Sequence, residues 1–216
     1  MSLRINDTVP DLKVVTDQGD ISLHDWIGDG WAIIFSHPKD FTPVCTTEFG
    51  EMARLEDEWT KRGVKVLGVS VDASADHAKW KVDIEAYSGS KPSFAIVADD
   101  GIELAKAFDM LPAEAVLPEG RTPAATATVR TVFVIGPDKK LRLSLTYPMV
   151  IGRNFDEILR VVDALQTAER AGVATPVNWR PGDDVIIPAA VSDEDAKEKF
   201  GSFEKRLPYL RTTSLK

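Results

Sequence analysis

This 216-residue chain contains a single cysteine, at position 45, and a cysteine thiol can act as a nucleophile. Cys45 ends a proline-containing loop, residues 37–45, and lies at or just before the first turn of a segment with helical periodicity. There, a sulfur faces unpaired backbone N–H groups and the positive end of the helix dipole, which favour the nucleophilic thiolate. The sequence therefore predicts a reactive thiol. The alternative is an inert, buried cysteine, which is the commoner state of a lone one.

The same count limits the chemistry that the chain supports. A single cysteine excludes an intrachain disulfide and zinc sites with two or four cysteines. The three histidines, His24, His37 and His77, together with Cys45 leave little room for another metal site. We therefore predict neither a metal nor a cofactor.

Hydrophobic periodicity predicts the elements that must position Cys45. Short, apolar runs predict buried strands, and apolar residues repeated every three or four positions predict amphipathic helices. The predicted strands are 31–36, 64–71 and 94–98, the predicted helices are 46–62, 76–87, 102–110 and 155–169, and the predicted hairpin joins 128–135 to 141–147. Residues 111–126 contain several prolines and predict a long loop.

This order of elements predicts the fold class α/β. Alternating strands and helices imply parallel strands with right-handed crossovers, and the hairpin adds an antiparallel edge, so the result is a mixed sheet sandwiched by helices. After Gly172 the pattern breaks, and we predict a main domain at 1–172 and a small C-terminal arm at 173–216, with a short helix near 193–200. An arm of this length is too short for a core of its own, so it must pack on its own domain or on a neighbouring subunit.

Composition and charge exclude further classes. Apolar residues make up 44% and charged residues 28%, which is ordinary for a globular chain. The net charge of −8 argues against a nucleic-acid partner, because phosphate binding requires clustered positive charge. We find no apolar run near the roughly 20 residues of a membrane span, nor a signal-peptide pattern at the N-terminus. A cytoplasmic location is therefore expected.

The loop before Cys45 resembles the active-site signature of the peroxiredoxins, because Pro38, Thr42 and Cys45 stand in the spacing Pro-x-x-x-Thr-x-x-Cys. His37 before Pro38 and the segments 130–140, 147–160 and 174–179 extend the similarity over nearly the whole chain. Together they resemble the one-cysteine, peroxiredoxin-6-type class. The resemblance implies a thioredoxin-like fold, with which the predicted order of elements agrees.

The resemblance also implies a thiol-dependent peroxidase for hydrogen peroxide and organic hydroperoxides, with roles in antioxidant defence and peroxide signalling. Cys45 would attack the terminal peroxide oxygen and become a sulfenic acid. Arg130 would donate hydrogen bonds to the thiolate and the peroxide, Thr42 would hydrogen-bond the peroxide, and Pro38 would shield the pocket from water. Ionisation of the thiol alone would raise the reaction rate too little for the fast chemistry typical of this family. Arg130 and Thr42 must therefore stabilise the transition state.

Three further side chains carry less specific signals. His37 is expected either to contact the peroxide pocket or to cap the end of its strand. Glu48 and Arg153 are expected to orient Arg130, with an ordinary surface ion pair as the alternative.

Without a second cysteine, the sulfenic acid of Cys45 requires an external thiol or another small or protein reductant. If that reductant is absent, sulfinic acid formation would inactivate the enzyme. A disulfide between the Cys45 residues of two chains remains chemically possible.

Some relatives in this class also act as phospholipases through a serine, a histidine and an aspartate. Here Gly30 stands in place of the serine, although His24 and Asp138 match. Because the nucleophile is missing, this activity is not expected.

Two other functions compete with the peroxidase. A Cys-His hydrolase, with His37 activating Cys45, has the right residue types but leaves Arg130 without a role. A thioredoxin-fold peroxide sensor or holdase chaperone would keep the fold but would not turn over. We also expect a homo-oligomer, at least a dimer, because the arm with Trp179 needs a surface on which to lie.

Overall fold

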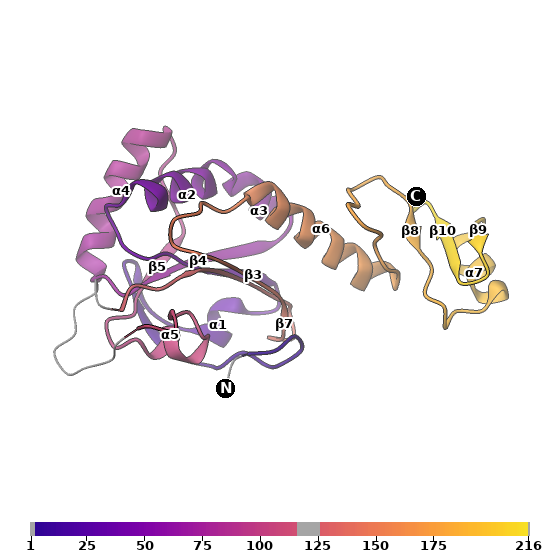
Figure 1. Ribbon diagram of the computed structural model, residues 1–216, viewed down its shortest axis with the longest axis horizontal. Helices are drawn as coiled ribbons and strands as arrows, with labels where there is room; N and C mark the ends of the chain where they lie inside the picture. Colours follow the sequence, from indigo (N-terminus) through magenta and orange to yellow (C-terminus); the bar gives the residue numbers. More distant parts are fainter. Residues whose placement is uncertain (1–2, 116–125, 216) are drawn as a thin grey trace. The chain divides into compact units, whose positions relative to one another are not determined.

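A computed structural model describes residues 3–115 and 126–215 (Figure 1). The chain forms two compact units, residues 1–153 and 154–216. The long helix that precedes Gly172 therefore groups with the C-terminal segment, whereas the predicted domain boundary lay after that helix. Most of the loop predicted at 111–126 lies outside the described residues.

The first unit is built on a seven-stranded mixed sheet of order β2-β1-β5-β4-β3-β6-β7. The three central strands, β5, β4 and β3, are parallel, and β6 and β7 continue the sheet as an antiparallel hairpin beside β3. The bounds are β1 Lys13–Thr16, β2 Gly19–Ser22, β3 Trp31–Ser36, β4 Val64–Ser70, β5 Ala95–Ala98, β6 Arg130–Ile135 and β7 Leu141–Tyr147. The predicted mixed sheet and its hairpin are confirmed.

Helices cover both faces of this sheet, which explains why β3 and β6 are buried almost throughout (Figure 1). The helices α2 Pro43–Arg54, α3 Glu56–Lys61 and α4 Ser74–Ser88 lie on one side, and α1 Leu23–Ile27 and α5 Glu103–Ala107 lie on the other. Strands buried on both faces read as continuous apolar runs, which made them predictable.

Two predictions differ from the structure near the first strands and α2. The single helix predicted at 46–62 is wrong, because the helix begins at Pro43 and is interrupted at Leu55, whose backbone leaves helical geometry. Pro43 starts the helix because the first helical position needs no backbone N–H donor. The β1–β2 hairpin was not predicted, since its strands have four residues each and are only partly buried.

Two glycines let α2 lie close to its neighbours. A Cβ on Gly68, in β4, would stand 3.0 Å from two ring atoms of Phe49, so the bare backbone allows this α2 side chain to rest directly on the sheet. A Cβ on Gly50 would stand 2.7 Å from Ser88 Cβ, so α2 and α4 approach closely at this point. Both contacts fix the helix that carries Cys45.

The second unit joins α6, Phe155–Ala171, to a small sheet. Asn154 caps α6 by accepting a hydrogen bond from the Glu157 N–H, and the helix ends at Gly172. The other elements are β8 Val185–Ile186, α7 Asp193–Phe200, β9 Glu204–Leu207 and β10 Leu210–Thr213, with β10 between β8 and β9. The short helix was predicted correctly, but the three-stranded sheet was not, because its strands are short and β9 is fully exposed.

Trp179 is buried inside this second unit. It packs with Ala164 of α6, Val173 and Val185, and its indole N–H donates to the Asp183 carbonyl at 3.0 Å. The C-terminal segment thus packs on α6 of its own chain. The expectation of an oligomer, as far as it rested on Trp179, loses that support.

Candidate active site

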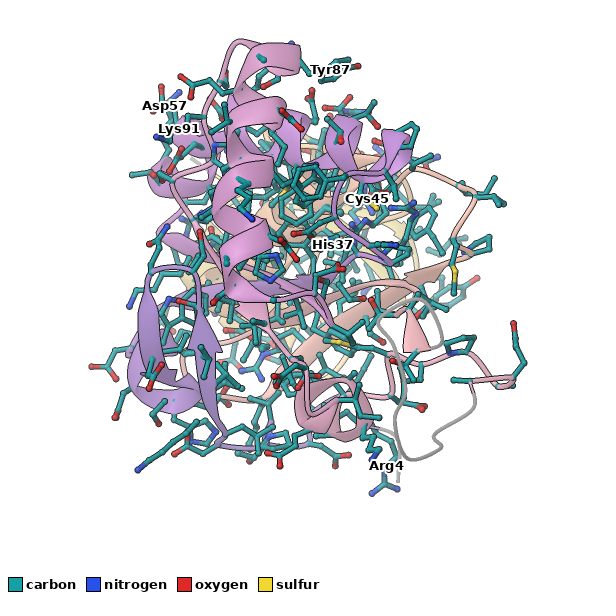
Figure 2. The ribbon with its side chains drawn as sticks, turned by 90° about the vertical axis from the view of Figure 1, so that its left-hand side faces the viewer. Arg4, His37, Cys45, Asp57, Tyr87 and Lys91 are labelled. Atoms are coloured by element: carbon teal, nitrogen blue, oxygen red, sulfur yellow. The ribbon has the colours of Figure 1, made fainter. Side chains whose placement is uncertain are left out.

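Cys45 is completely buried in the first turn of α2 (Figure 2). Its sulfur lies 3.3 Å from Nη1 of Arg130, the first residue of β6. Cys45 is the third residue of the helix and therefore lies in its first turn, where the sequence placed it. Arg130, 85 residues later, is brought to it because β6 pairs with β3, the strand that leads into the Cys45 loop.

Three hydrogen bonds from two nitrogens hold the guanidinium group of Arg130. Nε donates to the Met149 carbonyl at 2.8 Å, and Nη1 donates both to the Glu48 carboxylate at 2.7 Å and to the sulfur. Only 3% of Arg130 is exposed. A planar donor group fixed in this way cannot swing away from Cys45, which is the preorganisation that electrostatic catalysis requires.

The Glu48 carboxylate also binds a second arginine, Arg153. Arg153 donates from Nε to Oε1 at 2.9 Å, from Nη2 to Oε2 at 2.7 Å, and from its backbone N–H to Oε1 at 2.8 Å. Its Nη1 donates to the carbonyls of Ser36 and Thr131. The pair is thus buried and bidentate. One buried carboxylate thus binds both arginines, which is the geometry that orienting Arg130 requires, and the alternative of a surface ion pair is wrong.

The charges of this cluster complement a thiolate. Burial opposes ionisation of Glu48, but the guanidinium groups of Arg153 and Arg130 outweigh it and hold the pKa of Glu48 below its usual value. Burial lowers the pKa of Arg153, although Glu48 opposes that effect. Two guanidinium groups and one carboxylate leave one positive charge beside the sulfur. A negatively charged sulfur would neutralise it.

Thr42 and Pro38 lie within the loop that leads to Cys45. Thr42 is the N-cap residue of α2, and its hydroxyl donates to the Lys39 carbonyl at 2.9 Å. A hydroxyl that donates one hydrogen bond keeps two lone pairs for accepting others. Thr42 is partly exposed and Pro38 is buried.

His37 lies in a different environment from the one expected. It is fully buried, its ring stacks on Trp80 with centroids 4.9 Å apart, and its Nε2 lies 2.6 Å from Asp40 Oδ1. Its Nδ1 has no hydrogen-bond partner among the described residues. Contact with a peroxide therefore stays a prediction, and capping of the strand by the ring is not what the structure shows.

The sequence did not predict the groups that hold the site residues in place. The Met149 carbonyl that holds Arg130 is a backbone group and carries no sequence signal. Asp40 binds His37, and His77 binds Asp40, but 37 positions separate Asp40 from His77 in the sequence. Only the tertiary fold brings them together.

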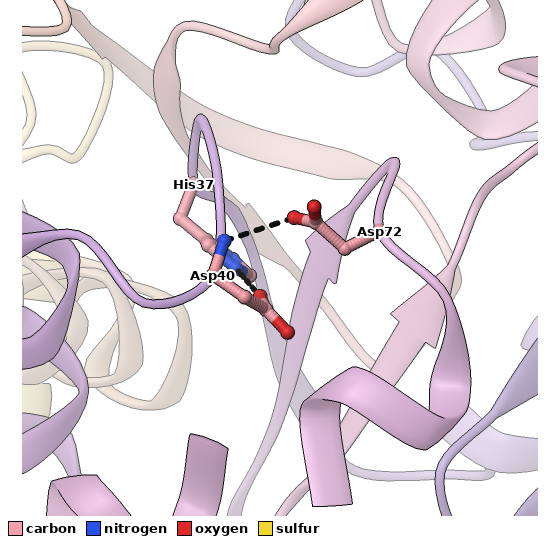
Figure 3. A group of neighbouring side chains, drawn as sticks. All are labelled: His37, Asp40 and Asp72. Carbon is pink, nitrogen blue, oxygen red and sulfur yellow. Dashed lines mark hydrogen bonds and ion pairs between the residues drawn. The ribbon is translucent and has the colours of Figure 1, made fainter. Parts of the chain in front are cut away.

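One group of described residues has the donor types of a metal site: His37, Asp40 and Asp72, whose ligand atoms lie within 4.8 Å of one another (Figure 3). Hydrogen bonds already engage His37 Nε2, both carboxylate oxygens of Asp40 and Oδ2 of Asp72. Asp40 faces His37 and His77 with its two oxygens, and Asp72 Oδ2 accepts from the Asp40 N–H and the Ser70 hydroxyl. The geometry is that of a hydrogen-bonded cluster.

The residues that match a phospholipase triad have other partners. His24 Nε2 lies 2.7 Å from the Val9 carbonyl, and Asp138 forms an ion pair with Arg142 at 2.9 Å. Gly30 offers no side chain to act as a nucleophile.

Comparisons with known proteins agree with this site. Residues 5–144 match the AhpC/TSA family, and residues 164–202 match the C-terminal domain of 1-Cys peroxiredoxin. Peroxiredoxin-6 of Gallus gallus is 48% identical, with 98% of this chain and 97% of that protein covered. The 1-Cys peroxiredoxin A of Oryza sativa is 50% identical, with 99% and 98% covered.

Solved structures lead to the same result. A mutant of peroxiredoxin 6 of Arenicola marina superposes with a TM-score of 0.91 at 43% identity, and the alignment covers 99% of this chain and 98% of that one. A yeast mitochondrial 1-Cys peroxiredoxin superposes with a TM-score of 0.89 at 46% identity, covering 99% and 100%. The thioredoxin-like fold is therefore confirmed.

Fold, site and relatives together define an antioxidant thiol peroxidase, an oxidoreductase that works through a single cysteine and an external reductant. The chain belongs to the AhpC/TSA family and, within it, to the 1-Cys peroxiredoxins. These relatives do not favour the sensor or holdase without turnover. Within residues 3–115 and 126–215, no helix combines the length and apolar character that crossing a bilayer requires.

Proposed function

We propose that Cys45 is the peroxidatic residue and that Arg130, Thr42 and Pro38 assist it directly. The observation that carries this proposal is the 3.3 Å contact between the Cys45 sulfur and Arg130 Nη1. The thiolate attacks the terminal oxygen of a hydroperoxide, a sulfur–oxygen bond forms and the oxygen–oxygen bond breaks. The products are the sulfenic acid of Cys45 and, after protonation, water or an alcohol.

Arg130 stabilises the charge that moves during this step. Negative charge passes from the sulfur to the departing oxygen, and a fixed guanidinium donor beside the sulfur can follow it without reorganisation. Thr42 accepts a hydrogen bond from the peroxide, because its own hydrogen is given to the Lys39 carbonyl. Pro38 is buried and has no N–H to donate, so it keeps water from the sulfur without competing for hydrogen bonds.

The substrates that we propose are hydrogen peroxide and organic hydroperoxides, and the reductant is a thiol. The superposed yeast structure is described as resolving its thiol through glutathione and thioredoxin systems. Since this chain also has a single cysteine, we propose glutathione or a thioredoxin-like protein as the donor. The buried sulfur must become accessible to that donor, so the loop before α2 has to open between the two half-reactions.

A homo-oligomer, at least a dimer, remains our proposal for the assembly, with a cytoplasmic location. The proposed oligomer is supported by exposed apolar side chains of the second unit, Val177, Leu207 and Tyr209, and by the position of β7 at the edge of the sheet. Together with α6, the hairpin edge is a candidate contact. Sedimentation at micromolar concentration tests the assembly: a species of 23.7 kDa would contradict it.

Intact-mass spectrometry tests the peroxidatic role. After one equivalent of hydrogen peroxide in the presence of dimedone, which traps sulfenic acids, we expect one adduct on the wild-type protein within seconds and none on Cys45→Ser. A thiol that survives excess peroxide for minutes would overturn the proposal. Repeated consumption of peroxide with a thiol donor separates an enzyme from a sensor, which consumes one peroxide per thiol.

A further inference from the structure

A buried polar cluster ties the loop before Cys45 to two other elements of the first unit, and Figure 3 shows three of its residues, His37, Asp40 and Asp72. Asp40 lies in this loop, with Oδ1 at 2.6 Å from His37 Nε2 and Oδ2 at 2.6 Å from His77 Nδ1 on α4. Its backbone N–H donates to Asp72 Oδ2 at 2.9 Å, just beyond the end of β4. One aspartate thus joins the cysteine loop to α4 and to the carboxyl edge of the sheet.

The partners of His77 determine where the protons of this cluster lie. A carbonyl can only accept, so His77 Nε2, 3.2 Å from the Val97 carbonyl, carries a proton. His77 Nδ1 and Asp40 Oδ2 then share a second proton, as an imidazolium and carboxylate or as two neutral groups. Both arrangements leave the pair without net charge, which burial requires.

The protonation of His37 follows from the same count of protons. With the shared proton between Asp40 and His77, Asp40 Oδ1 has none to give, so His37 Nε2 must donate to it. The reverse arrangement, with Asp40 donating to His37, would leave an uncompensated imidazolium at His77. His37 therefore carries its proton on Nε2, and its unpartnered Nδ1 is a bare acceptor.

The directions of titration agree with this arrangement. Burial holds the pKa of His37 below its usual value, which keeps the imidazole neutral. Burial opposes ionisation of Asp40, but the hydrogen bonds from His37 and His77 outweigh it and lower the pKa of Asp40.

The loop itself needs such a tether. It turns from β3 into α2 through Phe41, whose φ of +55° lies in the left-handed region that a bulky side chain rarely adopts. The Phe41 side chain is half exposed and provides little packing to offset that strain. The next residue, Thr42, is the N-cap of the helix that positions the sulfur.

We propose that Asp40 is a positioning residue for peroxide reduction: through His77 it anchors the cysteine loop to α4, and through His37 it holds the imidazole with Nδ1 as an acceptor. The inference rests on the peroxidatic role proposed for Cys45. A rate of peroxide reduction that Cys45→Ser leaves unchanged would refute that role, whereas the Asp40 variants test only the positioning role of Asp40.

The test compares Asp40→Ala and Asp40→Asn with a matched control, Asp17→Ala. Asp17 is also a buried carboxylate paired with α4, through Lys81, but it lies outside the cysteine loop. We expect Asp40→Ala to lower the second-order rate constant with hydrogen peroxide on the order of tenfold, and Asp17→Ala to leave it nearly unchanged. Asparagine should restore most of the rate, because its oxygen can accept from His37 while its amide donates to a neutral His77.

Equal slowing by Asp40→Ala and Asp17→Ala would show a general loss of stability and overturn the proposal, as would an unchanged rate in Asp40→Ala. Imidazole nitrogen-15 NMR of the wild-type protein supplies a readout that needs no folded variant. We expect protonated Nε2 and unprotonated Nδ1 at His37, and protonated Nε2 at His77. A protonated Nδ1 at His37 would refute the assigned arrangement.

Discussion

Glu48 and Arg153 form a buried, bidentate ion pair, with 2.9 Å between Nε and Oε1 and 2.7 Å between Nη2 and Oε2. The same carboxylate accepts from Arg130 at 2.7 Å, so this pair helps to fix the orientation of the arginine beside the sulfur. The distances make Glu48 the link between the core of the sheet and the reactive thiol.

Replacement of Arg130 by lysine should slow the reaction with peroxide about a hundredfold, although the charge is kept. A lysine lacks the planar set of donors that reaches Met149, Glu48 and the sulfur together. Stopped-flow measurement of the rate constant checks this. Arg54→Lys, on the exposed face of α2, is the control and should react like the wild type. A lysine variant of normal rate would show that charge alone is sufficient.

Glu48→Gln should lower both stability and rate. The change leaves Arg153 buried without its carboxylate, which should reduce the free energy of unfolding by about 3 kcal/mol. Urea unfolding measures this loss. Glu51→Gln, in an exposed pair on the same helix, should change it by less than about 1 kcal/mol. Comparable losses in the two variants would contradict the special position of Glu48.

The stabilisation from Glu48 should disappear in acid. Because the folded protein lowers the pKa of Glu48 below the ordinary 4.5, this contribution is complete above that value and is lost as the pH falls through the folded pKa. The difference in unfolding free energy between the parent and Glu48→Gln, both carrying Cys45→Ser, should therefore shrink as the pH falls below 4.5. A difference that grows in acid would reverse the assignment.

Thr42 should act through its hydroxyl. We expect Thr42→Ser to keep most of the peroxide rate and Thr42→Val to lose about tenfold, since valine keeps the shape but cannot accept a hydrogen bond. Thr47→Val removes an exposed hydroxyl on the same helix and serves as the control. If the serine and valine variants react at the same rate, the hydroxyl has no role in the step.

The central elements could be predicted because local pattern and tertiary environment agree there. Strands β3 and β4 are buried on both faces, and their continuous apolar runs read as such. The short hairpin β1–β2 and the sheet of the second unit could not be predicted in the same way. Their strands have four residues or fewer, too short for a clear apolar pattern, so tertiary pairing decides their conformation.

The reactive residue and its immediate loop are determined by the sequence itself: Pro43 can start a helix, and a cysteine two positions later then meets the N–H groups of the first turn. Only the tertiary structure decided that Arg130 and Arg153 share the Glu48 carboxylate, and that Asp40 binds two histidines on different elements. The physical reason is the range of the interactions. Helix initiation depends on neighbours in the chain, whereas a buried charge needs partners that long-range pairing of strands and helices must bring to it.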